Sequence, residues 1–558
     1  MKSMRHLLSL ALAGLALLAA PLLPAVAQEM KPVAVVAIAS IEEQLADIGY
    51  ITTVTGMEDA GKTIRLFGSA LTAGLDKSRP SGLYVIPAAG DFHAVAFVPV
   101  KDLKQFLEIH KEQIGTPEDA GDGVLKMTAA GAGGGGRDVF IKEQNGWAFV
   151  AETKEHLTNL PQDPSTMLGT LPKEYNIAAK VFVQNIPQEM RQSALDELKI
   201  GLERGLESPA VGRSDVDKET IQKMARNSLD QIQRLANEGE ELVIGLAIDA
   251  PGKRTFFEVT GLAKEGTSLA TQMALQADAK SSFSGFLLPE ASVTLNMTSK
   301  LGEQEIAQFG TMVKMFRDEF TKKIDDDPNM PADKREAAKA VFTQLLTHIE
   351  KTVASGKIDA GAALVLEPKA INVVAGVYVA DGVALEKSLK QIVELGKNEP
   401  DAPEVKFNVG THGDVQLHRL TATIPENVAE AREFFGDKLE IVIGTGPKSF
   451  YISAGKNAEN LLKSAIDRSA TTADKTVPPA QFHVALLPIL KFAAATSEGN
   501  PVLPALVTSL EQSGNDRISI ISTAVPRGTR TRIEVQEGVL KLIGEALKQF
   551  GADLNGIL

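Results

Sequence analysis

The stretch GKRTFFEV (Gly252–Val259) recurs in similar form as GTRTRIEV (Gly528–Val535) near the end of the chain. Other similarities occur in the same order along both halves. Self-similarity at a fixed spacing indicates a structural unit that is present more than once. We therefore predict two tandem, duplicated domains, residues 28–278 and 279–558, after an N-terminal segment of residues 1–27.

Five further pairs of segments show the same relationship. Each pair joins a run of alternating apolar residues in the first half to a similar run in the second. The pairs are 33–38 with 293–297, 92–100 with 371–379, 146–151 with 449–454, 175–183 with 481–487, and 242–248 with 518–525. Alternation at period 2, separated by segments at period 3.6, indicates strands interleaved with helices.

The turns at 250–253 and 525–528 are too short for a parallel crossover, so their flanking strands must be antiparallel neighbours. We predict an α+β fold in which each domain is a mainly antiparallel sheet with helices on one face. On the repeated strand we expect one set of side chains to face the core, namely Thr255, Phe257 and Val259, with Thr531, Ile533 and Val535 in the copy. The alternate set, Arg254, Phe256 and Glu258 with Arg530, Arg532 and Glu534, would then form a solvated ladder.

Long helical hairpins interrupt this pattern. The periodicity predicts helices over 188–206 and 215–237 in the first half, and over 304–324 and 332–353 in the second. Ser214 and Asp217 form a candidate capping pair. The apolar stripe of the helix that follows consists of Ile221, Met224, Leu229, Ile232 and Leu235. Such stripes usually pack against another helix or a sheet; the alternative is a hairpin that binds a partner or touches a membrane.

The N-terminus has the features of a secretory signal. Lys2 and Arg5 precede an apolar run from residue 7 to residue 20, and Ala25 and Ala27 supply the small residues of a cleavage site. We predict cleavage after Ala27 and a location in the periplasm or outside the cell. No later run of 18 apolar residues follows, so we expect a soluble mature chain without a transmembrane segment.

Composition narrows the set of partners. Removing residues 1–27 removes Lys2 and Arg5 and no acidic residue, so the formal net charge goes from −13 to −15. An acidic surface repels nucleic-acid phosphate and anionic lipid headgroups. The chain has no cysteine, which excludes disulfides, thiol catalysis and thiolate-bound metal. A secretory signal without disulfides is typical of the bacterial cell envelope.

Two glycine-rich motifs invite a nucleotide-binding interpretation. Gly56–Thr63 (GMEDAGKT) matches the phosphate-loop pattern letter for letter. However, Glu58 and Asp59 would place negative charge where phosphate must sit, and the second half has no equivalent. The glycine run at 131–136 has no following Lys-Ser/Thr and is typical of a flexible hairpin loop. We therefore predict no cofactor.

The remaining candidates for chemistry form no coherent set. His412, Asp414 and His418 share a hairpin and can share one face, but no histidine pair has the helical spacing of a zinc site. The acidic run at 325–327 lacks the pattern of a calcium loop. Glu258 and Glu534 would have to meet to act as an acid–base pair, and no serine lies in a nucleophile elbow. We predict no catalytic, cofactor-binding or metal-binding residues.

Three phrases, NGWAFV (145–150), NIPQEMR (185–191) and IGLAID (244–249), resemble those of large secreted bacterial proteins of unknown function with an internal duplication. This resemblance implies no activity and no site residues.

We consider three functions. The first is a secreted, soluble, non-catalytic binding or structural protein of the bacterial envelope, whose partner is a protein, a hydrophobic small molecule or a second copy of the chain. The second is a carrier of a hydrophobic ligand in a sheet–helix gap lined by residues such as Phe182, Phe257, Phe482 and Ile533. The third is a secreted hydrolase, which would need a cluster of titratable groups with shifted pKa values in one cleft.

Overall fold

The computed structural model describes residues 31–88, 91–129, 137–206, 218–327, 330–397, 402–473, 475–497, 499–500 and 502–549. The predicted signal peptide, the glycine run at 131–136 and the pair Ser214 and Asp217 lie outside these residues. The chain divides into two compact units. The first holds the described residues up to Leu269 and those from Glu534 onward, and the second is Ala270–Ile533. The last helix thus counts with the first unit.

The first unit contains a sheet in which neighbouring strands of the described residues pair antiparallel. Its strands lie in the order β4 (Glu118–Asp119), β5 (Val124–Ala129), β6 (Arg137–Gln144), β7 (Trp147–Ala151), β3 (Asp91–Pro99), β2 (Ser81–Ala88), β1 (Ala34–Ile38), β8 (Ile177–Phe182), β9 (Gly239–Asp249) and β10 (Arg254–Ala263).

The second unit has the same strand order, also antiparallel. Its strands are β14 (Glu404–His412), β15 (Val415–Thr423), β16 (Lys438–Gly446), β17 (Ser449–Ala454), β13 (Ala370–Tyr378), β12 (Lys357–Glu367), β11 (Val293–Lys300), β18 (Ala480–Ala485), β19 (Arg517–Val525) and β20 (Gly528–Gln536), of which the part up to Ile533 belongs to this unit.

The similar sequence segments fall on strands that occupy the same position in the two orders. By position in the two orders, β1 corresponds to β11, β3 to β13, β7 to β17, β8 to β18, β9 to β19 and β10 to β20. The short turn at 250–253 joins the antiparallel neighbours β9 and β10, as predicted. The prediction of an α+β fold with a large antiparallel sheet is therefore confirmed.

Each unit carries two helical hairpins, at the same two places in its strand sequence. The first unit has α2 (Ile41–Val54) and α3 (Glu58–Leu71) between β1 and β2, and the longer α6 (Gln188–Leu206) and α7 (Lys218–Glu238) between β8 and β9. The second unit has the long hairpin first, α9 (Glu303–Asp325) and α10 (Ala332–Ala354), and the short one later, α14 (Leu486–Thr496) and α15 (Val502–Ser513). The two units thus exchange the lengths of their hairpins.

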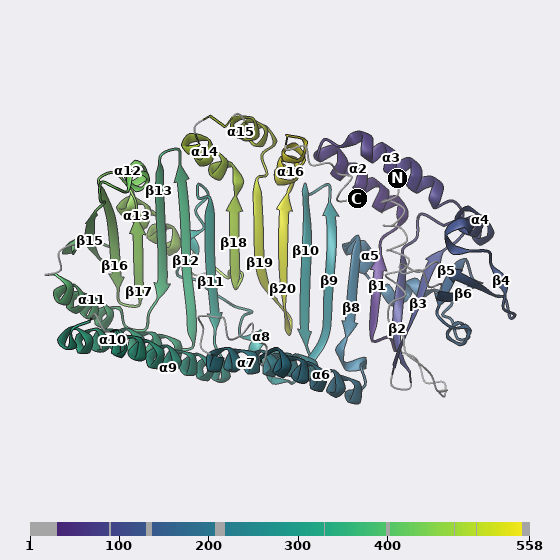
Figure 1. The fold of residues 1–558 in the computed structure, drawn as a ribbon, viewed down its shortest axis with the longest axis horizontal. Coiled ribbons are helices and arrows are strands. Elements are labelled where there is room, and N and C mark those ends of the chain that lie inside the picture. Colours follow the sequence, from purple (N-terminus) through teal and green to yellow (C-terminus); the bar gives the residue numbers. More distant parts are fainter. Residues whose placement is uncertain are drawn as a thin grey trace. The chain divides into compact units, whose positions relative to one another are not determined.

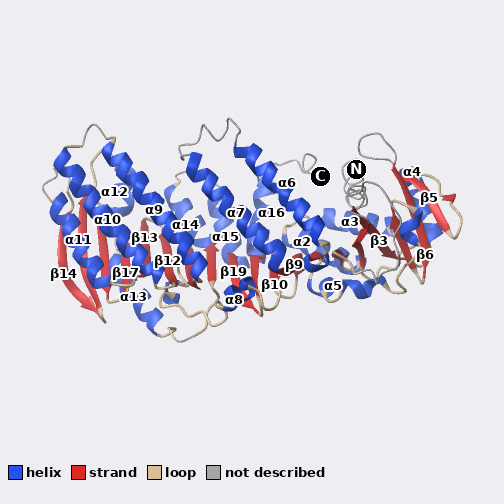
Figure 2. Cartoon of the chain, turned by 90° about the horizontal axis from the view of Figure 1, so that it is seen from below, coloured by secondary structure: helices blue, strands red, loops and turns tan. Residues whose placement is uncertain are grey.

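Figure 1 shows that, in each unit, one hairpin lies at one end of the strands and the other hairpin at the opposite end. In the second unit, α9 and α10 pack on each other and run past one end of β11–β13, and Figure 2 views them from that end. The boundaries predicted for α9 and α10 agree with the structure to within one residue.

The other helices are 4 to 15 residues long. They are α4 (Leu103–Ile114), α5 (Leu171–Glu174), α8 (Ser268–Ala274), α11 (Gly382–Gly396), α12 (Ala429–Phe435), α13 (Ala458–Ala470) and α16 (Glu537–Gln549). The carboxylates of Asp102 and Asp381 accept hydrogen bonds of 2.9 Å from the backbone N–H groups of Gln105 and Ala384, and so fix the starts of α4 and α11.

Helices are not confined to one face of the sheet, contrary to our expectation. In the second unit, Leu461 and Leu462 of α13 share a core with Val374 and Val442 on one face. Helix α11 lies on the opposite face, because Glu386 accepts a hydrogen bond from Thr445 there. The two faces of one sheet are therefore covered by different elements over different strands.

The main core of each unit lies on one face of its sheet. In the first unit it includes Phe97, Trp147 and Phe149, and in the second unit Phe283 and Phe286 of the segment before β11. A second core in the first unit lies on the other face, where Leu103 and Leu107 of α4 cover Ile141 and Ala148. We call the face with the main core the covered face.

The apolar stripe of α7 does not pack as predicted. Ile232 and Leu235 are exposed by 43% and 50%, while the side chains of Ile221 and Met224 lie outside the described set. Helices α6 and α7 contact each other, and Arg191 donates to the carbonyl of Ala236. The interpretation of this stripe as a buried helix face is therefore wrong for its C-terminal half.

Phe283 packs flat against the covered face because two strand positions there are glycine. A Cβ on Gly361 would lie 2.6 Å from the carbonyl oxygen of Phe283 and 2.8 Å from Cβ of Phe286. Substituting Gly361→Ala should therefore lower the free energy of unfolding by about 1–3 kcal/mol, as overpacking does. Gly410→Ala is the matched control, because nothing lies within 4 Å of that position. Urea unfolding of both variants measures the difference; equal stability would show that the segment before β11 packs elsewhere.

Candidate functional site

The face of the second unit opposite its main core, beyond the strands that α11 covers, presents three parallel rows of apolar side chains across six neighbouring strands. We call this open part the uncovered face. The middle row joins Ile452, Ala375, Ala362, Leu295, Phe482 and Ile520, each opposite the next. The outer rows are Ala454, Val373, Leu364, Val293, Val484 and Ile518 on one side, and Phe450, Val377, Ala360, Met297, Ala480 and Ser522 on the other. We call these eighteen positions the second apolar face.

None of these side chains is buried. Met297, Val373, Val377, Ile452 and Ile520 are exposed by 38–41%, which is high for the interior of a sheet. Ser522 is the one polar member, and its hydroxyl is hydrogen-bonded to Thr531. With strands about 4.8 Å apart and like-facing residues about 6.7 Å apart, the face measures roughly 29 by 20 Å, or about 600 Å².

The covered face beneath it is rich in polar groups. Thr294, Asn296 and Thr298 of β11 are buried, as is Asp359 of β12. The hydroxyl of Ser281 donates to Asp359 at 2.6 Å, and Asn296 donates to that hydroxyl at 2.8 Å. These hydrogen bonds lower the cost of burying the donors and the carboxylate, while the Oδ1 of Asn296 is buried without a hydrogen-bond partner. Strand β11 therefore places its hydrogen-bonding side chains inside and its hydrocarbon outside.

The first unit has the same arrangement over four strands. Its three rows contain Ile38, Ile177, Leu246 and Phe257; Val36, Ala179, Ile244 and Val259; and Ala34, Val181, Leu242 and Gly261. We call these twelve positions the first apolar face. None is buried, and Ile177, Leu242, Ile244, Leu246 and Phe257 are exposed by 37–47%. The face ends toward β3 and β7, where α4 covers the sheet.

Polar side chains are again buried on the opposite face. The Tyr175 hydroxyl donates to Glu258 at 2.5 Å, and Glu258 is 2% exposed. The Asn176 amide donates to Asp47 at 2.5 Å, while its carbonyl oxygen accepts from the N–H of Ile248 at 2.7 Å. Burial raises the pKa of Asp47, and the bond from Asn176 partly opposes this effect.

The prediction for the two faces of the repeated strand is therefore wrong. Phe257 and Ile533, which we expected in the core, are exposed, whereas Phe256 and Glu258 are buried. The physical reason is that Tyr175, which packs against Gly245, supplies Glu258 with a hydrogen-bond partner inside the unit. A carboxylate with a buried partner can take the core side of a strand.

The expected lining of a hydrophobic site is partly found. Phe257, Phe482 and Ile533 are on uncovered sheet surfaces. Phe182 instead packs against the main core of the first unit. Three of these four side chains therefore lie on an open sheet surface, whereas the sequence suggested a gap between sheet and helices.

A polar cluster limits the second apolar face at β15 and β16. His418 is buried, and its Nδ1 accepts from the N–H of Asn408 at 3.1 Å. Thr445 donates to Glu386 at 3.0 Å, so the Nε2–H of His418 must donate to Thr445, at 3.0 Å. Burial lowers the pKa of His418, while the carboxylate of Glu386 acts in the opposite direction.

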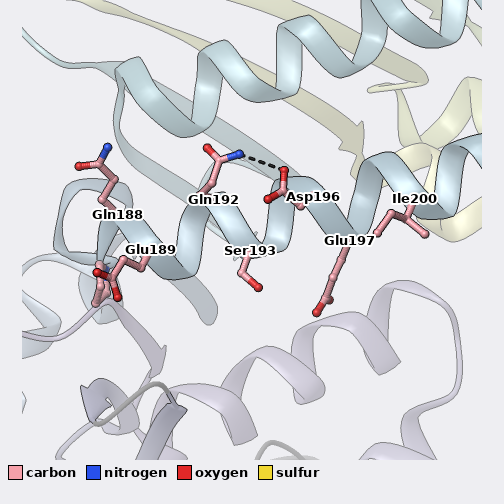
Figure 3. A pocket seen from close by; sticks show the side chains of 8 residues that line it. Gln188, Glu189, Gln192, Ser193, Asp196, Glu197 and Ile200 are labelled. Atoms are coloured by element: carbon pink, nitrogen blue, oxygen red, sulfur yellow. Dashed lines mark hydrogen bonds between the residues drawn. The ribbon is translucent and has the colours of Figure 1, made fainter.

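An open hollow of about 860 Å³ lies along α6. Its lining includes Glu189, Ser193 and Glu197 on one side of the helix, while Gln192 donates to Asp196 at 3.0 Å on another (Figure 3). The volume would admit a drug-sized ligand. The lining is mostly exposed, polar and acidic, which does not suit a hydrophobic one.

The phosphate-loop match is helical. Residues 51–54 end α2, and Glu58–Leu71 form α3, so no strand precedes the glycine and no loop follows it. Lys62 pairs with Asp59 at 3.0 Å, and Gly61 packs against Thr52. In this conformation the backbone N–H groups of the motif cannot surround a phosphate.

His412 and His418 are not brought together either. His412 bonds to Asp467 at 2.7 Å, whereas His418 turns inward to Thr445. Among the described residues, no group of three or more His, Asp or Glu side chains is placed to hold a metal ion. Glu258 and Glu534 also bond to different partners, Tyr175 and Arg254.

Two serine–histidine contacts occur among the described residues: His483 with Ser519 at 2.8 Å, and His348 of α10 with Ser388 of α11. The second of these resembles a nucleophile pair. The distance from Nε2 to the hydroxyl oxygen is 2.8 Å. However, the Ser388 hydroxyl donates to the carbonyl of Ala384 at 3.0 Å. The imidazole must then be the donor and cannot take a proton from the serine.

Within the part of the chain that the structure describes, none of the helices combines the length and apolar character needed to cross a membrane. No protein-family model, no curated protein and no solved structure matches the chain. The two apolar faces are the features of the described residues that most need a functional explanation.

The buried imidazole predicts a pH effect. Its lowered pKa means that the folded state binds fewer protons than the unfolded state, so stability is present above pH 6.5 and declines as the pH falls through the unfolded pKa. We expect the urea midpoint of the wild type to fall between pH 7 and pH 5.5, and His418→Gln to lose part of this dependence. His110→Gln in the first unit is the control. An unchanged slope in His418→Gln would contradict the assignment of the neutral, Nε2-protonated form.

Proposed function

We propose that the protein is a secreted, non-catalytic binding protein that holds hydrophobic ligands on its two apolar sheet faces. The observation that carries this proposal is the placement of hydrocarbon on the uncovered side of β11 and of hydrogen-bonding groups on its buried side. Monomeric proteins rarely expose contiguous apolar patches of more than a few hundred Å² without a function. The second apolar face, at about 600 Å², is at the upper end of that range.

We further propose that the two units arose by tandem duplication and that each copy retains one ligand-binding face. The equal strand orders, and the location of similar sequence segments on equivalent strands, support this. The apolar faces also coincide, since both include the first, eighth and ninth strands of their unit. The predicted cleavage after Ala27 would place the protein in the periplasm or outside the cell, where a carrier of hydrophobic ligands has a role.

A charge on the first apolar face should weaken binding. We expect wild-type protein to enhance the fluorescence of N-phenyl-1-naphthylamine, and Ile244→Glu to weaken the first-unit component about tenfold, because the ligand would then desolvate a carboxylate. Leu66→Glu is the matched control: Leu66 is 71% exposed on α3 but lies off the face.

Native mass spectrometry of the mature protein from its own host should show a mass excess that disappears on denaturation. If the wild type neither carries such a mass nor binds the probe, the proposal is wrong. An equal loss in Ile244→Glu and Leu66→Glu would show that the probe reports general surface hydrophobicity.

A further inference from the structure

We infer that the occupant of the second apolar face is a membrane phospholipid, whose two acyl chains lie across the strands in the two furrows between the three rows. This inference rests on the proposed function and specifies its ligand. It follows from the chemistry, the size and the regularity of the face.

The chemistry of the face excludes most protein partners. A protein–protein interface carries about one hydrogen bond per 100–200 Å², so a face of about 600 Å² should offer roughly three to six. Every backbone group here is part of the sheet, and among the eighteen side chains only Ser522 is polar, with Thr531 already bonded to it. A surface that offers one hydroxyl group, at the end of one outer row, is complementary to hydrocarbon.

The dimensions of the second apolar face also favour a lipid over a protein partner. A stable protein interface buries about 800 Å² on each partner, which is more than this face provides. The six strands place the ends of a row about 24 Å apart. One acyl chain spans half of a hydrocarbon core of about 30 Å, or about 15 Å. A chain therefore fits within the length of a furrow.

The number of furrows favours a ligand with two chains. Side chains on one face of a strand repeat about every 6.7 Å, so the three rows leave two parallel furrows. The rows stay in register over all six strands, because Leu295 is opposite both Ala362 and Phe482, and Ala362 is opposite Ala375. The middle row, which includes Leu295, separates the two furrows and would contact both chains.

The test uses full-length mature protein and phosphatidylethanolamine vesicles that contain a phosphatidylethanolamine with a diazirine in one acyl chain. After photolysis, we expect cross-links in peptides of β11, β18 and β19, at one phospholipid per second unit. Leu295→Asp should reduce the cross-linked yield about tenfold, and Ile520→Asp, at a more exposed position of the same row, should do the same if Leu295→Asp fails to fold. Val383→Asp is the matched control, since Val383 is 69% exposed on α11.

The outcomes separate the inference from the proposed function. Cross-links outside the second apolar face, or equal yields in Leu295→Asp and Val383→Asp, would overturn the phospholipid assignment while binding of N-phenyl-1-naphthylamine remained intact. Competition by palmitic acid as effective as by unlabelled phospholipid would overturn the two-chain assignment. If neither the diazirine phospholipid nor N-phenyl-1-naphthylamine bound to the protein, the proposed function itself would be wrong.

Discussion

The arrangement of the second unit depends on the buried carboxylate of Asp359. This carboxylate holds the covered face of the unit together. It accepts from the hydroxyl of Ser281 at 2.6 Å and from the N–H of Ser282 at 2.8 Å, and it pairs with Lys357 at 2.9 Å. A buried charge without partners would destabilise the fold. A buried carboxylate with three partners instead fixes the positions of those partners. These bonds attach the segment before β11 to the sheet, so that Phe283 and Phe286 cover one face and the hydrocarbon of β11 and β12 remains on the other.

The first unit also has buried polar groups on its covered face and apolar side chains on the opposite face, but different residues form its network. There the groups that hold the covering segment are Tyr175 and Asn176, which bond to Glu258 and Asp47. The two networks lie on different strands, β11 and β12 in the second unit and β9 and β10 in the first, yet both place polar side chains on the covered face.

The sequence predicts the topology well and the side-chain orientation poorly. Alternation and short turns identify the strands, and the periodicity over residues 304–353 identifies α9 and α10 almost to the residue. Alternation cannot say which face of a strand is covered, because that depends on distant segments such as the one containing Tyr175. The usual rule that apolar residues face inward then assigns Phe257 and Glu258 to the wrong sides. The candidate site was missed for the same reason, although the unusual density of polar residues at alternate positions of β11 was a signal for it.

The most direct test of this account uses the absence of cysteine from the chain. Ala362 and Ala363 are neighbours on β12, the first on the second apolar face and the second 3% exposed in the main core. Single substitutions Ala362→Cys and Ala363→Cys can be compared by their rates of reaction with iodoacetamide in the native protein, with urea-unfolded protein as the reference. The account predicts that Ala362→Cys reacts within about tenfold of the unfolded rate, whereas Ala363→Cys is protected to the extent allowed by global unfolding. Protection of both thiols, or the reverse order, would show that the apolar face is covered and would contradict the account.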